Sequence, residues 1–298
     1  MTKQITVGYD GSGPSAEAVL WAAAEAGALG ARLRVVSCYQ IPLAGETIGG
    51  WAPTEAYATL MDGCRDALAE IKAFVDQATP GLDVVLEASA GPATTALLDN
   101  LNPEDLLVVG ASGHEGAAAF WLGSTPRHLV RHSPCPVVVV HGAASRGRPD
   151  RVVVGVDGSA ASERALHWAG DEADRHGVPL LVVHAWMYPY LAVDSSSSQA
   201  RDLTNIDAAC LLDIAVESAR ERFAAEVTGE LVESGPVTAL LETVRDGDLL
   251  VIGSRGRGAI AGNLFGSTVN TVLDRCAVPT VVVRGASESD RPVEHEPT

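Results

Sequence analysis

Two glycine-rich segments carry the residues best suited to chemistry. Each follows a short apolar run and has the spacing G-x2-G-x9-G-S-T. Glycines let successive backbone amides point into one concavity that binds anions, and hydroxyl residues at a helix start add donors and the positive end of the helix dipole. The recurring pattern therefore predicts phosphate binding rather than an ordinary loop. The two copies comprise Gly110, Gly113, Gly123, Ser124 and Thr125, and Gly253, Gly256, Gly266, Ser267 and Thr268.

The two copies differ in charge. The second offers a polyphosphate the side chains and backbone of Ser254, Arg255, Arg257 and Gly258. At the last three of these positions the first copy has Ser112, His114 and Glu115. A carboxylate about 4 Å from a phosphate charge costs up to ~4 kcal/mol at an effective dielectric of about 20, before solvent and salt reduce it. We therefore expect the second copy to bind a polyphosphate more tightly.

An aspartate also stands where each of two apolar strands is expected to end. It can accept hydrogen bonds from an adenine amine or from ribose hydroxyls, or help to hold a metal. It can equally close an Asx-turn or cap a helix, and the sequence leaves both interpretations open. The two segments comprise Gly8, Asp10 and Ser12, and Gly155, Asp157 and Ser159.

These motifs recur because the chain is a tandem duplication. Residues 7–12 return at 154–159, an offset of 147, and residues 136–140 return at 279–283, an offset of 143. Six such blocks occur in the same order and define a unit of about 145 residues. The expected divisions are unit 1 over 1–142, a linker over 143–150, unit 2 over 151–285, and a disordered acidic tail over 286–298.

Within each unit, short β-branched runs alternate with longer segments of helical periodicity. This alternation predicts an α/β fold with a doubly wound, Rossmann-like parallel sheet. Ligands of such sheets bind beyond the carboxyl ends of the strands, where the aspartates and the glycine loops fall. In unit 1 we expect helices at 15–29 and 55–78 and strands at 5–9, 33–38, 82–88, 106–109 and 137–140.

Together these motifs resemble those of tandem universal stress proteins, whose nucleotide signature is G-x2-G-x9-G-(S/T). The resemblance covers nearly the whole chain apart from the linker and the tail. It implies two five-stranded, parallel α/β units, similar to adenine nucleotide alpha hydrolases, with the phosphates of ATP held by the signature loops. It also implies that Asp10 and Asp157 lie near the adenosine, and that Cys38 and Ala185 meet the adenine through their backbones.

Members of this family usually pair through their last strands, which implies an internal pseudo-dimer with residues 137–140 beside 280–283. The implied function is an ATP-binding sensor or regulator in a stress or dormancy response, with a slow ATP hydrolase as the alternative. We expect Mg²⁺ to be held mainly through the ATP phosphates, because no carboxylate cluster suggests a dedicated metal site. No catalytic residue is assigned, and the expected partner is a second copy, giving a homodimer, or a regulatory protein.

The composition and the remaining glycines argue against other classes. A formal net charge of −17 argues against non-specific nucleic-acid binding, which depends on Lys and Arg. Lys3 and Lys72, the only lysines, lie outside the glycine loops, which excludes a P-loop NTPase. The glycines after the first strand do not form G-x-G-x-x-G, which argues against a dinucleotide-binding oxidoreductase. Asp10 stands where an adenylylating enzyme needs a phosphate-binding loop, which argues against that class.

The sequence also suggests a compartment. The longest apolar stretch, 178–193, is interrupted by His184 and Pro189 and is shorter than the ~20 residues that a membrane span requires. No signal-peptide pattern opens the chain. The five cysteines are scattered without a CxxC pair, as expected of free thiols in a reducing compartment. We therefore expect a cytoplasmic protein that binds no membrane.

Overall fold

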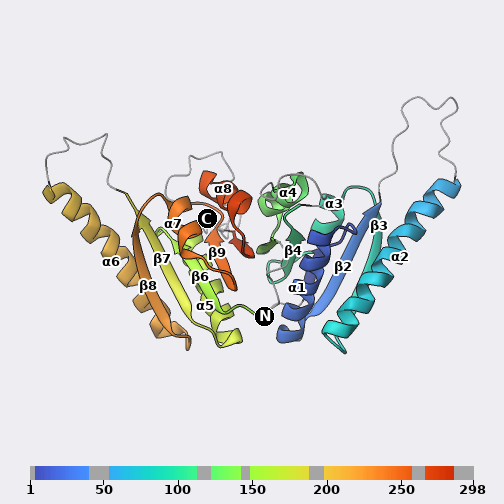
Figure 1. Ribbon diagram of the computed structural model, residues 1–298, viewed down its shortest axis with the longest axis horizontal. Helices are drawn as coiled ribbons and strands as arrows, with labels where there is room; N and C mark the ends of the chain where they lie inside the picture. Colours follow the sequence, from blue (N-terminus) through green and yellow to red (C-terminus); the bar gives the residue numbers. More distant parts are fainter. Residues whose placement is uncertain are drawn as a thin grey trace, which may run out of the picture.

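The computed structural model describes residues 4–39, 54–112, 122–141, 148–187, 198–256 and 266–284. Each half of the chain alternates strands with helices, and the two halves lie side by side with the outermost long helices on opposite flanks (Figure 1). Among the described helices, none is both long enough and apolar enough to cross a bilayer.

The first half supplies five strands that are parallel to one another. Its elements are β1 (Gln4–Gly8), α1 (Gly13–Leu29), β2 (Arg32–Tyr39), α2 (Thr54–Ala78), β3 (Val84–Ala90), α3 (Ala93–Leu98), β4 (Leu106–Gly110), α4 (Ser124–His132) and β5 (Val137–Val140).

The second half repeats this order of elements. Its strands are again parallel to one another. The elements are β6 (Arg151–Val156), α5 (Ala160–His176), β7 (Leu180–Trp186), α6 (Ser198–Arg222), β8 (Val227–Glu233), α7 (Pro236–Thr243), β9 (Asp248–Gly253), α8 (Ser267–Arg275) and β10 (Thr280–Val283).

The two halves join through their last strands into one ten-stranded sheet, in the order β3-β2-β1-β4-β5-β10-β9-β6-β7-β8. Strands β5 and β10 run antiparallel, with Val138 opposite Val281 and Val139 opposite Thr280. This junction confirms the predicted internal pseudo-dimer of two five-stranded α/β units. Because the last strands pair within the chain, both outer edges of the sheet, β3 and β8, are third strands of their units.

Apolar side chains fill both faces of the sheet because successive residues on a strand point to opposite sides. On β6, Val152 and Val154 pack into the core beneath α1, α2, α5 and α6, whereas Val153 packs into the core beneath α3, α4, α7 and α8. Each unit is thus a three-layer sandwich whose strand ends lie between the two helical layers. This arrangement confirms the predicted α/β class.

One strand is displaced from its expected position. We expected a strand at 82–88, but β3 spans Val84–Ala90. Gly81 has a φ of +83°, and the N–H of Leu82 donates to the carbonyl of Thr79 at 3.4 Å. These two features keep residues 79–82 in a turn, so the apolar Leu82 ends the turn and does not begin the strand.

Candidate functional site

The aspartate after each first strand closes an Asx-turn. Oδ1 of Asp10 accepts the N–H of Ser12 at 3.0 Å and its hydroxyl at 2.6 Å. Oδ1 of Asp157 accepts the N–H of Ser159 at 3.0 Å. Gly11 and Gly158 occupy the middle of these turns with φ of +83° and +74°. The local alternative to ligand binding is therefore present in both units, and it fixes where each carboxylate lies.

The serine of each turn also caps the following helix. Oγ of Ser12 accepts the N–H of Ser15 at 3.3 Å, and Oγ of Ser159 accepts the N–H of Ser162 at 3.2 Å. An oxygen acceptor at this position satisfies one of the backbone amides that a helix start leaves without an intrahelical partner. The cap thereby ties each turn rigidly to α1 or α5.

In unit 2 the structure brings the aspartate turn against the signature loop. The hydroxyl of Ser159 donates to the carbonyl of Arg255 at 3.3 Å, although the two residues are 96 positions apart. A side chain at Gly256 would collide with Oδ2 of Asp157. Asp157 is half-buried and Arg255 is exposed. The first-strand acid and the glycine loop thus share one edge of the sheet, as the sequence predicted for a parallel α/β unit.

The first glycine of each signature packs against the start of a helix. A Cβ at Gly110 would lie 2.8 Å from the carbonyl oxygen of Pro14, and a Cβ at Gly253 would lie 2.7 Å from the carbonyl carbon of Ala161. Real Cβ atoms do not approach backbone so closely. Close packing of α1 and α5 on the strand ends is therefore a structural reason for these glycines, separate from any ligand.

The last glycine of each signature begins a helix whose amides lack a side-chain cap. Gly123 is the N-cap of α4 and Gly266 the N-cap of α8, and neither makes a side-chain cap hydrogen bond. The N–H of Gly123 donates to the carbonyl of Ala111 at 2.8 Å and that of Gly266 to the carbonyl of Ser254 at 3.4 Å, which closes each loop at its base. Helix starts of this kind suit an anion.

The hydroxyl residues behind these caps are accessible. Ser124 and Ser267 are exposed, and Thr125 and Thr268 are half-buried. Ser112 is half-buried at the start of the first loop, and Ser254 is buried in the second. Four residues of the predicted site, Gly113, His114, Arg257 and Gly258, lie outside the described residues, so the charge difference between the copies stays a prediction.

In each unit, one glycine of the predicted site lies under the short third helix. A Cβ at Gly8 would lie 3.0 Å from Cδ1 of Leu97, and one at Gly155 would lie 3.0 Å from Cδ2 of Leu240. These glycines therefore let α3 and α7 pack on β1 and β6. Their contact with a ligand stays a prediction.

The predicted adenine-facing residues, Cys38 and Ala185, are half-buried near the carboxyl ends of β2 and β7. Beside Ala185, Nδ1 of His184 lies 2.7 Å from the carbonyl oxygen of Val156, so this half-buried ring has a hydrogen-bond partner within the fold. Burial, followed by the nearby Cys64 and Glu87, raises the pKa of the Cys38 thiol from 9.0 to about 11.

This raised pKa predicts a poorly reactive thiol at the adenine position. Each unit of pKa lowers the thiolate fraction tenfold at neutral pH, so a rise from 9.0 to about 11 lowers it about a hundredfold. In the native protein at pH 7.5 we expect iodoacetamide to label the exposed Cys210 first and Cys38 far more slowly, as mapped by mass spectrometry. Urea-denatured protein is the control, and equal native rates at the two cysteines would contradict the expectation.

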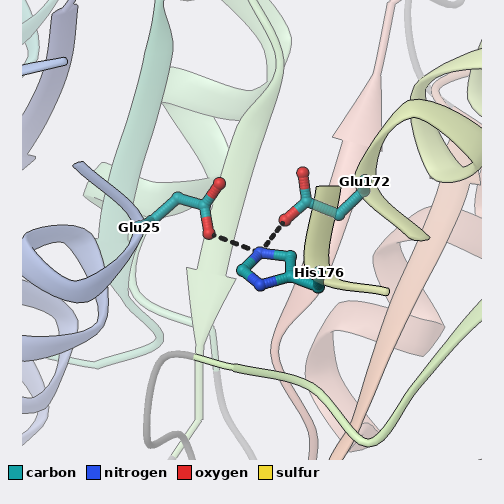
Figure 2. Close-up of side chains that lie close together, drawn as sticks. All are labelled: Glu25, Glu172 and His176. Atoms are coloured by element: carbon teal, nitrogen blue, oxygen red, sulfur yellow. Dashed lines mark hydrogen bonds and ion pairs between the residues drawn. The ribbon is translucent and has the colours of Figure 1, made fainter. Parts of the chain in front are cut away.

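Sequence reasoning missed a charged cluster between the units. Glu25 of α1 and Glu172 of α5 are each 1 % exposed at their side chains. Figure 2 shows His176 between them, with Nε2 at 3.0 Å from Oε2 of Glu25 and 3.0 Å from Oε1 of Glu172. Arg175 pairs with Glu172, and its Nη1 lies 3.5 Å from Oε1 of Glu25. A glutamate at the same position of two alanine-rich helices was the available signal.

The positive and negative charges within the cluster offset each other. Hydrogen bonds to Glu172 and Glu25 raise the pKa of His176 to about 9, so the ring is an imidazolium at neutral pH. Burial raises the pKa of Glu25. The donor atoms are close enough together to hold a metal ion. However, His176 and Arg175 already supply two positive charges for two carboxylates. We therefore interpret the cluster as an ion-pair network that joins the units.

Comparisons with known proteins agree with this architecture. A model of the universal stress protein family matches residues 1–141 and again 149–284. Universal stress protein Rv2005c and universal stress protein Rv2623, both from Mycobacterium tuberculosis (strain ATCC 25618 / H37Rv), are each 32 % identical to this chain, covering 94 % of it and 96 % of their own lengths.

The fold has a solved counterpart of the same extent. The crystal structure of a universal stress protein from Archaeoglobus fulgidus DSM 4304 superimposes with a TM-score of 0.69 at 19 % identity, covering 96 % of this chain and 97 % of that one. The sequence matches establish the family, and the structural match establishes the fold. This chain therefore belongs to the universal stress protein family and contains two tandem units of it.

Proposed function

We propose that this chain binds ATP at the carboxyl edge of each unit, and that nucleotide occupancy regulates its interactions in a stress or dormancy response. The observation that carries the proposal is the contact between the aspartate turn and the signature loop in unit 2. Ser159 donates to the carbonyl of Arg255, and Gly256 lies against Asp157. An acid suited to ribose or adenine and a loop suited to phosphate thus lie at one edge of the sheet, where ligands of parallel α/β folds bind.

The phosphates would lie at the start of α8 in unit 2 and of α4 in unit 1. There the glycine caps leave backbone amides to an anion, and Ser267 and Thr268, or Ser124 and Thr125, add hydroxyl donors. Mg²⁺ would be bound mainly by the phosphates. Asp157 holds the N–H of Ser159 through Oδ1, which orients its carboxylate for the nucleoside.

The regulatory part of the proposal concerns partners. The last strands, through which the family usually pairs, are already joined within this chain. A second copy or a regulatory protein would therefore dock on another surface. We place the protein in the cytoplasm, where ATP and Mg²⁺ are available and free cysteines stay reduced.

The first test is the nucleotide content of freshly purified protein. After acid denaturation, we expect chromatography to find about one ATP per chain, because the second site is expected to bind more tightly. About two ATP per chain would contradict that asymmetry. ADP in place of ATP would favour slow hydrolysis. If no nucleotide is released, the protein is titrated with Mg²⁺-ATP in a calorimeter, and GTP and cyclic AMP are titrated for comparison. The proposal fails if Mg²⁺-ATP then gives no heat of binding.

Matched glycine variants assign the sites. Gly256→Asp places a second carboxylate against Asp157 at the proposed phosphate loop, so we expect it to abolish the tighter binding event. Gly113→Asp is the equivalent change in unit 1 and should remove only the weaker event. Calorimetric titration of both proteins with Mg²⁺-ATP measures the two losses, and equal losses would show that the sites do not differ.

A further inference from the structure

An ion pair between the units holds the end of the first signature loop. In Figure 1, α4 and α8 face each other at the centre of the molecule. Oδ1 of Asp274, on α8, accepts the backbone N–H of Leu122 at 3.1 Å. The same oxygen pairs with Arg127 of α4, whose Nε donates to the carbonyl of Leu122 at 3.2 Å. Both backbone polar groups of Leu122 are thus held by one pair that spans the two units.

Leu122 occupies a sensitive position. It directly precedes Gly123, which caps α4 and closes the base of the loop by donating to Ala111 at 2.8 Å. The Leu122 side chain is buried among α4 and its neighbours. A shift of Leu122 would therefore move Gly123 and the first amides of α4, which are the proposed phosphate donors of unit 1.

The equivalents of Asp274 and Arg127 in the other unit are different residue types. At the offset of 143, Asp274 corresponds to Arg131 and Arg127 to Asn270. The side chain of Arg131 has no acceptor for a backbone N–H. Nδ2 of Asn270 donates to the carbonyl of Gly266 at 3.4 Å, and its Oδ1 accepts from Nη1 of Arg127 at 3.5 Å. Unit 2 thus supplies an anionic acceptor to the loop of unit 1, whereas the equivalent side chain of unit 1, Arg131, is cationic.

We propose that Asp274 is a positioning residue for the nucleotide site of unit 1, which is incomplete without unit 2. This inference rests on the proposed function, because it assumes that the first signature loop binds ATP. It makes ATP affinity in unit 1 depend on the contact between α4 and α8, whereas ATP affinity in unit 2 does not depend on Asp274. The two sites therefore differ in their supports as well as in their loop charges.

The test measures the two sites separately in the full chain. In a Gly256→Asp background, which leaves only the first site, Asp274→Ala should weaken Mg²⁺-ATP binding about tenfold, as expected for one charge-assisted hydrogen bond. Asp274→Asn keeps an acceptor for the N–H of Leu122 and should recover most of that loss. In a Gly113→Asp background, which leaves only the second site, Asp274→Ala should change the affinity less than about twofold. Equal weakening of both sites would show that Asp274 only stabilises the fold as a whole, and this would overturn the proposal.

Hydrogen exchange without nucleotide separates this inference from the proposed function. Asp274→Ala should raise amide exchange in residues 122–127 about tenfold and leave residues 266–271 unchanged. If the unsubstituted chain binds no ATP, the proposed function fails, whatever the exchange shows. If ATP binds but exchange in residues 122–127 does not respond to Asp274→Ala, the positioning role fails alone.

Discussion

Replacing His176 with leucine is expected to destabilise the protein by about 3–5 kcal/mol at pH 7, measured by urea unfolding. The imidazolium hydrogen-bonds to Glu25 and Glu172, which are both 1 % exposed. Its removal leaves two buried carboxylates facing each other, with Arg175 as their remaining cation. Leucine is the matched choice because Leu29 holds the equivalent position in unit 1.

The stability contributed by His176 is expected to fall as pH rises. The folded pKa of His176 is raised from 6.5 to about 9, so its contribution to stability is fully present below pH 6.5 and is lost as pH rises through 9. Burial raises the pKa of Glu25 and His176 lowers it, so His176→Leu should raise that pKa further and let Glu25 take up a proton as pH falls. The free energy of unfolding of the unsubstituted chain should therefore exceed that of His176→Leu most near pH 6.5. The difference should shrink steadily between pH 6.5 and 9.

A double-mutant cycle separates the ion pairs from packing. Glu25→Gln in the His176→Leu background removes one of the two opposed carboxylates and should restore at least about 1 kcal/mol. In the unsubstituted background, Glu25→Gln should instead destabilise, because the imidazolium loses an ionised partner. If His176→Leu costs less than about 1 kcal/mol and its effect does not vary with pH, the cluster makes no net contribution to stability, as holds for some buried ion pairs.

The same cluster lies where the two units meet and affects which pairing is favourable. Arg175 and His176 stand where unit 1 has Ala28 and Leu29, so only unit 2 brings cations to the junction. Two copies of unit 1 joined in this geometry would bury two Glu25 carboxylates without these cations, which is strongly unfavourable. The cluster therefore favours pairing of unit 1 with unit 2, in agreement with the continuous sheet within one chain.

Much of the fold could be predicted because its causes are local or repeated. Apolar runs such as 137–140 specify buried strands, and Ser12 and Ser159 cap the helices that periodicity predicts. Duplication made the glycine spacing recognisable, and the topology of a parallel sheet placed Asp157 beside that loop. The pairing of the last strands followed from the family resemblance, because nothing in an isolated strand specifies its partner.

The missed residues share a different cause. The contacts of Asp274 with Leu122 and of His176 with Glu25 join positions about 150 residues apart, and they depend on how the two units meet. Their unit-1 equivalents, Arg131 and Leu29, are different residue types, so a search for repeated motifs passes over them. Asymmetric features of a symmetric junction are visible only once the junction is known.

The glycine that ends β9 provides the second large effect. Gly253→Ala is expected to destabilise the protein by about 3 kcal/mol, at the upper end of usual overpacking costs. The new Cβ would lie 2.7 Å from the carbonyl carbon of Ala161 and 2.9 Å from the backbone nitrogen of Ser162. Because these obstacles are backbone atoms of the first turn of α5, the helix must move as a whole and no side chain can turn aside.

That movement should also affect binding, since Oγ of Ser162 accepts the N–H of Asp157 at 3.3 Å and so links α5 to the aspartate turn. Urea unfolding and Mg²⁺-ATP titration of Gly253→Ala should therefore both show a loss, and Gly110→Ala should repeat the stability loss in unit 1. Gly235→Ala is the control, because a methyl group there would have nothing within 4 Å and the φ of −64° suits alanine. If the free energy of unfolding of Gly253→Ala lies within about 1 kcal/mol of that of the control, α5 can move away from the new methyl group at little cost. The signature glycine would then be required only by the nucleotide.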